Sequence, residues 1–208
     1  DVYKRQVNQE IKIPDEILEH HKDFFANAIK EYVLDFAISI RENDDRYDYD
    51  IDYNLSEEEV VKQIEDKEKD IRTKSMVQSA PESGWIVRSF AGDYNPIHSH
   101  PTCTLACVGY LKVPDWEDEI NKDAEDHSGL SHGCLQFLYG DQSSFTVNSY
   151  NVRPEVGSFY LFPGWLRHTV YPFSSKGERR SFSINFAAQL GTVDVMIRKS
   201  DGSLEALE

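Results

Sequence analysis

Apolar residues in the first part of the chain recur with the period of an α-helix. Between Pro14 and Ile40 they come in pairs, about one pair per helical turn: Ile17/Leu18, Phe24/Phe25, Ala28/Ile29, Tyr32/Val33 and Phe36/Ala37. Pro14 suits the first turn of a helix, where a missing N–H group is tolerated. The pattern therefore predicts one amphipathic helix from Pro14 to about Ile40.

A second helix is predicted after an acidic, tyrosine-rich stretch, Asn43–Asn54, which is typical of a surface loop. Ser56 and Glu59 have the spacing of a capping box, in which the serine caps the helix and the glutamate reaches back. Apolar residues then recur at helical spacing as far as Ile71. Proline and glycine in Pro81–Gly84 predict the end of this helical region.

From Trp85 onward the pattern changes to short β-rich segments separated by Gly, Pro, Asn or Asp. The acidic stretch Asp115–His127 is expected to be a loop inserted between two of them. About eight short strands with turn signals are typical of a sandwich or barrel. The predicted strands are Trp85–Phe90, Cys103–Val113, Cys134–Leu138, Phe145–Tyr150, Ser158–Phe162, Thr169–Tyr171, Arg180–Ala187 and Val193–Arg198.

These segments predict one mainly-β domain over residues 1–208, because 208 residues are enough for a single domain with its own core. Within it we expect an N-terminal helical support at 1–84, a β-core at 85–198 and a tail at 199–208. The helices have no obvious core of their own, so we expect them to pack against the outside of the β-core.

Composition narrows the classes of partner. Hydrophobic residues make up 39% and aromatic residues 12%, which indicates a folded protein. The net charge of −15 repels a phosphate backbone, so we expect no nucleic-acid partner. No apolar run approaches the roughly 20 residues of a membrane-spanning helix, and the polar start is unlike a signal peptide. The odd number of cysteines, 3, predicts reduced thiols and a cytoplasmic protein.

Three histidines are candidate metal ligands. His98 and His100 are two residues apart, so on an extended strand both side chains would face the same side. His168 is a third candidate from a distant segment. Isolated H-x-H pairs are more often surface features, but this pair follows a turn in a strand-rich region. Imidazole ligands suit iron, zinc, copper or nickel, and three protein ligands leave coordination positions open, as catalytic sites do.

Arg179 and Ser181 follow His168 on a predicted strand and form a candidate anion-binding pair. Their spacing places both side chains on one face, and a planar guanidinium can bind a carboxylate through two hydrogen bonds. Arg180 is the alternative anchor, and it would lie on the opposite face. The apolar residues Phe182, Ile184 and Phe186 alternate with polar ones, which favours Arg179 as the inward-facing arginine.

Together these residues resemble the iron(II)- and 2-oxoglutarate-dependent oxygenases, and most closely a group found in bacteria and phages. The likeness covers Trp85 to Phe186, about half of the chain. The matching stretches, in order, are Gly92–Pro101, Gly109–Pro114, Pro154–Pro163, His168–Pro172 and Glu178–Phe186.

The resemblance implies a double-stranded β-helix, the cupin-like jelly-roll barrel, that binds Fe(II), 2-oxoglutarate and O₂. His98 matches the first metal ligand and His168 the last. His100 stands where most of the superfamily has a carboxylate, which either makes a three-histidine site or excludes His100 from the ligands. Arg179 matches the arginine that pairs with the remote carboxylate of 2-oxoglutarate, with a further hydrogen bond from Ser181. Tyr110 either reaches the cosubstrate or packs in the core.

The implied activity is a dioxygenase that couples decarboxylation of 2-oxoglutarate to oxidation of a substrate C–H bond. The expected substrate is a small molecule or side chain, and a homodimer is compatible with the sequence. One alternative is a three-histidine cupin-type dioxygenase that does not use 2-oxoglutarate. The spacing of Gly92 and His98 fits that family, but no glutamate follows the H-x-H pair. Another alternative is a barrel that binds a metal or ligand without turnover.

Overall fold

The computed structural model describes residues 9–42, 51–117, 120, 132–141, 144–192, 197–198 and 204–205. The predicted loop Asn43–Asn54 and the predicted insertion Asp115–His127 lie largely outside these residues. Contacts divide the chain into two compact units, residues 1–21 with 81–187 and residues 22–80 with 188–208. The expectation that residues 1–208 form one domain stays a prediction.

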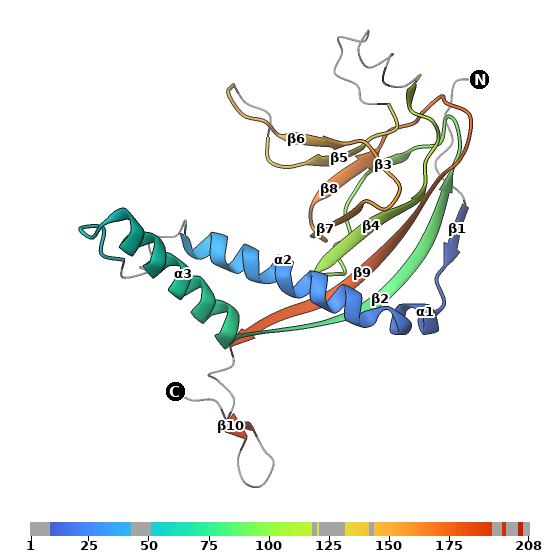
Figure 1. Ribbon diagram of the computed structural model, residues 1–208. Coiled ribbons are helices and arrows are strands. Elements are labelled where there is room, and N and C mark those ends of the chain that lie inside the picture. Colours follow the sequence, from blue (N-terminus) through green and yellow to red (C-terminus); the bar gives the residue numbers. More distant parts are fainter. Residues whose placement is uncertain are drawn as a thin grey trace. The chain divides into compact units, whose positions relative to one another are not determined.

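Two antiparallel sheets form the β-core, as Figure 1 shows. The five-stranded sheet runs in the order β1 (Gln9–Lys12), β2 (Ser75–Ser89), β9 (Arg179–Thr192), β4 (Leu105–Lys112) and β7 (Phe159–Pro163). The four-stranded sheet runs in the order β3 (Asn95–His98), β8 (Arg167–Val170), β5 (Leu135–Leu138) and β6 (Ser149–Val152). Most sheet neighbours are distant in sequence, as in a jelly roll. The predicted double-stranded β-helix is therefore confirmed. A separate pair joins β10 (Ile197–Arg198) to β11 (Leu204–Glu205).

Strand boundaries differ from the sequence prediction in three places. β2 begins at Ser75, so Pro81–Gly84 lies inside a strand and does not end a helical region. β1 pairs only with Trp85–Arg88, so the part of β2 around Pro81 has no β1 partner. β6 begins at Ser149, after Phe145, which has a positive φ of 68°. β1 itself carried no clear signal in the sequence.

The N-terminal periodic segment forms two helices, α1 (Asp15–His20) and α2 (Lys22–Glu42), and not one. The break is at His21, whose N–H donates to the Ile17 carbonyl in a tight turn, and it coincides with the boundary between the two units. The helix α3 (Glu57–Lys74) follows. No helix in the described part of the chain is both long and apolar enough to cross a membrane.

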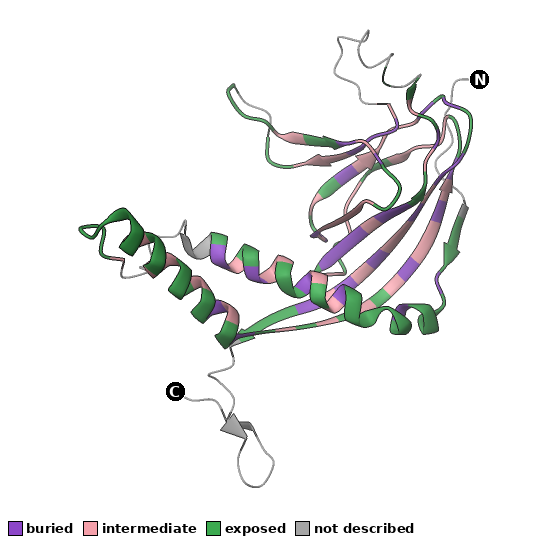
Figure 2. Ribbon diagram, viewed as in Figure 1, coloured by how far each residue is buried: buried purple, intermediate pink, exposed green. Residues whose placement is uncertain are grey.

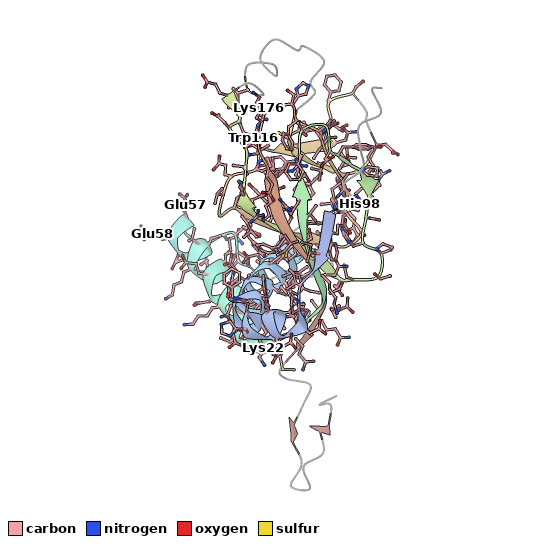
Figure 3. The ribbon with its side chains drawn as sticks, turned by 90° about the vertical axis from the view of Figure 1, so that its right-hand side faces the viewer. Lys22, Glu57, Glu58, His98, Trp116 and Lys176 are labelled. Atoms are coloured by element: carbon pink, nitrogen blue, oxygen red, sulfur yellow. The ribbon has the colours of Figure 1, made fainter. Side chains whose placement is uncertain are left out.

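The predicted capping box at the start of α3 is confirmed. The Glu59 carboxylate accepts hydrogen bonds from the Ser56 N–H at 3.1 Å and from the Ser56 hydroxyl at 2.6 Å. Glu57 and Glu58 project from the first turn (Figure 3), where negative charge favours the positive end of the helix dipole. Local sequence chemistry therefore determines where this helix begins.

Alternation along β9 separates the core from the cavity face. Buried and less buried residues follow one another along much of β2 and β9 (Figure 2), whereas most of β4 is buried. Ile184 lies against Gly84, where an added Cβ would be 3.2 Å from both Ile184 Cγ1 and Leu18 Cδ2. Successive strand residues point to opposite faces, so Ser183 and Asn185 face away from Leu18. This face of β9 is the one that builds the site.

Candidate metal centre

His98 and His168 lie opposite each other on the paired strands β3 and β8. Directly opposed residues of an antiparallel pair carry their side chains on the same face. The Nδ1 atom of His98 lies 2.8 Å from the Pro96 carbonyl, and that of His168 lies 3.0 Å from the Leu166 carbonyl. In each case Nδ1–H donates to the carbonyl, which leaves Nε2 as the free acceptor that a metal ion requires.

His100 lies just beyond the end of β3, so the H-x-H pair does not occupy one continuous strand as the sequence suggested. The loop is held instead by its backbone, because the His100 N–H donates to the Gly164 carbonyl at 2.7 Å. Cys103 N–H in turn donates to the His100 carbonyl at 3.3 Å. Trp85 stacks on the imidazole with ring centroids 6.0 Å apart. The loop conformation and not strand periodicity therefore places the third histidine.

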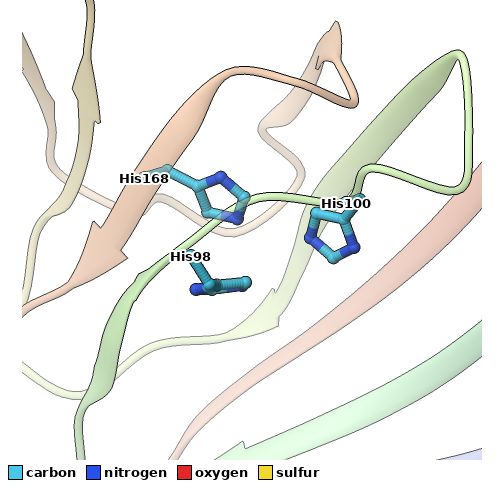
Figure 4. A group of neighbouring side chains, drawn as sticks. All are labelled: His98, His100 and His168. Atoms are coloured by element: carbon cyan, nitrogen blue, oxygen red, sulfur yellow. The ribbon is translucent and has the colours of Figure 1, made fainter.

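The three imidazoles nevertheless converge, as Figure 4 shows. One ring nitrogen from each of His98, His100 and His168 lies within 4.8 Å of the other two, which is a spacing that can hold a metal ion. The ring centroids of His98 and His168 are 4.2 Å apart, and those of His100 and His168 are 5.2 Å apart. Three ligands on one side leave other coordination positions open.

Burial keeps His100 and His168 in the form that binds metals. Desolvation lowers the pKa of His168 to about 4, with smaller contributions from the charges of His98 and His100. Desolvation and the nearby His98 also lower the pKa of His100. Neutral imidazole is the ligating form, so the site is ready for a cation near neutral pH.

A cavity of about 360 Å³ contains the histidine cluster and extends between the two sheets. All three residues of the predicted cosubstrate site, Arg179, Ser181 and Tyr110, line the same cavity. Tyr110 and Ser181 are opposite each other in the β4–β9 register, so their side chains share the inner face. The sequence-predicted metal and anion sites are therefore brought together in one space.

Arg179 is a buried cation on which the Asp93 carboxylate acts electrostatically but without forming an ion pair. Its side chain is only 2% exposed, and its Nη1 donates to the carbonyls of Gly133 at 2.9 Å and Tyr171 at 3.4 Å. Among the residues that the structure describes, no carboxylate forms an ion pair with it, and none accepts a hydrogen bond from its Nε or Nη2. Burial lowers the pKa of Arg179. A desolvated guanidinium of this kind is stabilised by an anion.

Arg180, the alternative anchor, points to the opposite face. It is partly exposed and donates to the Glu178 carboxylate through Nε at 2.9 Å and Nη2 at 2.8 Å. It does not line the cavity. The predicted alternation along β9, with Arg179 inward, is therefore what the structure has.

Two contributors to the site were missed by sequence reasoning. Trp85 was assigned only to a strand, yet it lines the cavity and stacks on His100. Gly164 lies so close to the His100 loop that a side chain has no room there. An added Cβ would lie 2.7 Å from the His100 carbonyl oxygen and still closer to the Cys103 carbonyl oxygen. The dipeptide Pro163-Gly164 signalled a turn, but nothing in the sequence linked that turn to His100.

Comparisons with known proteins agree with this geometry. Residues 83–185, about half of the chain, match the model of a family described as "Putative 2OG-Fe(II) oxygenase". The chain belongs to the 2OG-Fe(II) oxygenases. The family description itself names the two groups, iron(II) and 2-oxoglutarate, that members use. No curated protein matches the chain.

Several solved structures are similar to this oxygenase at low identity. A 2OG-Fe(II) oxygenase family oxidoreductase from Burkholderia pseudomallei is 14% identical over 53% of this chain and 45% of its own, with a TM-score of 0.40. A prolyl-4-hydroxylase from Pseudomonas putida is 18% identical over 66% of this chain and 68% of its own, with a TM-score of 0.37. A cupin domain from Bordetella pertussis is 14% identical over 54% of this chain and 93% of its own, with a TM-score of 0.32. The match thus spans less than half of the Burkholderia protein.

The residues of this oxygenase fit both groups named by the family. Three imidazoles form a donor set that suits iron. The guanidinium of Arg179, buried without a carboxylate partner among the described residues, suits one carboxylate of a dicarboxylic acid. Both lie in one cavity, so a single small acid has room to contact them together.

Proposed function

We propose that this chain hydroxylates a C–H bond of a small molecule or side chain, with Fe(II), 2-oxoglutarate and O₂. In this proposal His98, His100 and His168 hold the iron, and Arg179 binds the remote carboxylate of 2-oxoglutarate. Bound iron would supply the oxidation chemistry that accompanies conversion of 2-oxoglutarate to succinate and CO₂. The protein itself binds, orients and shields the reactants.

The observation that carries the proposal is the buried Arg179 in the same cavity as the histidine cluster. A remote carboxylate would neutralise its charge and accept hydrogen bonds from Nε and Nη2. The Ser181 hydroxyl and the Tyr110 phenol line the cavity beside it and can each donate another hydrogen bond. Burial raises the pKa of Tyr110, so the phenol stays protonated and remains a donor.

The other walls of the cavity support the same chemistry. Val108, Leu135 and Phe162 line it with apolar side chains. Such walls exclude water, which strengthens the interactions of Arg179 with a bound anion and protects the reacting groups from side reactions. The substrate to be hydroxylated would bind in the same cavity.

Anaerobic titration of the iron-loaded protein with 2-oxoglutarate tests the proposal. We expect a weak visible charge-transfer band when 2-oxoglutarate chelates the iron. Arg179→Ala should raise the dissociation constant for 2-oxoglutarate by about 30-fold or more, since a desolvated charge pair is lost. The matched control is Arg180→Ala, which removes the neighbouring arginine from the outer face and should leave the affinity within about threefold.

Three outcomes would contradict the proposal. The absence of both a band and succinate formation in air would exclude 2-oxoglutarate as cosubstrate. Oxygen consumption with an organic substrate but without 2-oxoglutarate would instead identify a three-histidine cupin-type dioxygenase. Metal binding with no turnover of any kind would indicate a non-catalytic binding barrel.

A further inference from the structure

The three histidines of the cluster differ in how their second ring nitrogen is satisfied. His98 and His168 each have a backbone carbonyl beside Nδ1, from Pro96 and Leu166. No residue in the described part of the chain is hydrogen-bonded to either ring nitrogen of His100. Histidines that bind metals almost always donate the other ring N–H to an acceptor, which orients the ring and determines its tautomer. Among the described residues, His100 therefore has no acceptor of the kind that His98 and His168 have.

Asn185 has the complementary deficiency. Its Oδ1 is buried and has no hydrogen-bond partner, alone among buried side-chain oxygen and nitrogen atoms of the described residues. Asn185 is opposite Ala106 in the β4–β9 register and two residues from the cavity-lining Ser183, so it belongs to the inner face. Buried polar atoms are rarely left unpaired without a reason.

Backbone hydrogen bonds connect this end of β9 to the His100 loop. The Thr104 N–H donates to the Phe186 carbonyl at 3.0 Å, and the Gly164 N–H donates to the Thr104 carbonyl at 2.9 Å. The Gly164 carbonyl accepts from the His100 N–H at 2.7 Å. Asn185, the neighbour of Phe186, is thus at the same level of the sheet as His100.

Trp85 approaches His100 from the other side of β9. It lies on β2, the neighbour of β9, and its ring stacks on the imidazole of His100. The His100 ring therefore reaches from the β7 side of the sheet toward β2, across the strand that carries Asn185. An acceptor without a donor and a ring without an acceptor thus lie at the same end of the sheet.

We propose that Asn185 is a positioning residue for His100. When Nε2 of His100 binds the metal ion, Oδ1 of Asn185 accepts a hydrogen bond from the Nδ1–H of His100. This bond fixes the tautomer and orientation of the one ligand that replaces the usual carboxylate. The inference rests on the metal site of the proposed function, but it does not depend on 2-oxoglutarate.

Cobalt(II) binding to the metal-free protein, followed by absorption in the absence of 2-oxoglutarate, tests this role. Asn185→Leu has a similar volume and no acceptor, and it should weaken Co(II) binding by about 10- to 100-fold. Its metal-free form should melt at the same temperature as the wild type or higher, because an unpaired buried acceptor has been removed. Asn185→Asp retains an acceptor oxygen and should retain Co(II) binding. Asn185→Ala gives the same comparison if the leucine variant does not fold.

A double-mutant cycle with His100→Ala separates positioning from a general structural role. If Asn185 acts through His100, the double variant should bind Co(II) no more weakly than His100→Ala alone. Unchanged Co(II) affinity in Asn185→Leu, or losses that multiply in the double variant, would overturn the inference. If the variants show the expected Co(II) affinities but the wild-type protein does not bind 2-oxoglutarate, the proposed function would be overturned and the role of Asn185 would stand.

Discussion

At the scale of single residues, two neighbouring side chains at the start of β9 differ in their electrostatic surroundings. Arg179 faces the cavity without a carboxylate partner among the described residues, whereas Glu178 is 5% exposed and paired with several cations. Its carboxylate accepts hydrogen bonds from Arg180 and from Arg88 Nε at 2.6 Å, with Lys112 Nζ at 3.5 Å. These pairs hold Arg180 outward and, because adjacent strand residues alternate, keep Arg179 inward.

The Glu178 cluster predicts a defined loss of stability in acid. Hydrogen bonds from Arg180 and Arg88 hold the pKa of Glu178 at about 2, below its ordinary value of 4.5. A carboxyl group with a lowered pKa in the folded state stabilises the fold above its unfolded pKa, and this stabilisation disappears as the pH falls. Stability from Glu178 should therefore be complete above about pH 4.5 and lost progressively toward pH 2.

Glu178→Gln tests this prediction through urea unfolding at a series of pH values. At pH 7 we expect the variant to be less stable by about 1–2 kcal/mol, a modest value because solvent screens the partly exposed cations. The difference from wild type should narrow between pH 4.5 and pH 2. A difference that stays constant over this range would show that the charge of Glu178 is not the stabilising feature.

At the scale of elements, the site depends on a strand pair and a turn that lie far apart in sequence. β3 and β8 place His98 opposite His168, and the turn at Gly164 holds the loop that carries His100. Gly164 allows this turn because glycine lets two backbone segments approach closely, and a side chain at this position would have no room. The third histidine of the cluster is therefore positioned by main-chain contacts.

Gly164→Ala should damage the metal site through this turn. The added Cβ would collide with the carbonyl oxygens of His100 and Cys103, so the loop must move. We expect a loss of about 1–3 kcal/mol in the free energy of unfolding and weaker Co(II) binding. Gly191→Ala is the matched control, since the nearest atom to its Cβ would be Met76 O at 3.9 Å. Equal Co(II) affinities in the two variants would contradict the role of the turn.

At the scale of the whole molecule, metal binding should couple segments that the chain separates by about 70 residues. A ligand that binds only the folded state at 100 times its dissociation constant stabilises it by about 2.7 kcal/mol. For a chain of this size that corresponds to a rise of roughly 5–10 °C in the melting temperature. Thermal unfolding with Co(II) and with a chelator measures the shift.

Two histidine variants make this measurement specific. His168→Ala should abolish the rise in melting temperature, because it removes a ligand of the cluster. His20→Ala removes a histidine that α1 carries outside the cluster and should preserve the rise. An equal rise in both variants would mean that cobalt stabilises the protein by binding at another site.

The expected small-molecule substrate, the absence of nucleic-acid and membrane partners, the homodimer and the cytoplasmic location stay predictions.

The sequence pattern alone predicted the class of the fold and the residues that the structure brings together in the cavity. Period-two alternation along β9 indicated that Arg179 and Ser181 face inward, because the alternation is a property of the strand itself. The capping box at Ser56 and Glu59 was equally readable, since its partners are three residues apart. His98, His100 and His168 were identifiable from their residue type and their place among the strands.

Only the tertiary structure decided how these residues are held. The extension of β2 through Pro81 depends on neighbouring strands, which override local propensity, and the break at His21 had no local signal either. His100 is placed by Gly164 and Trp85, and no pattern along the chain links either residue to it. Such contacts join residues far apart in sequence, so no local pattern encodes them. The sequence names the ligands, and long-range packing determines their geometry.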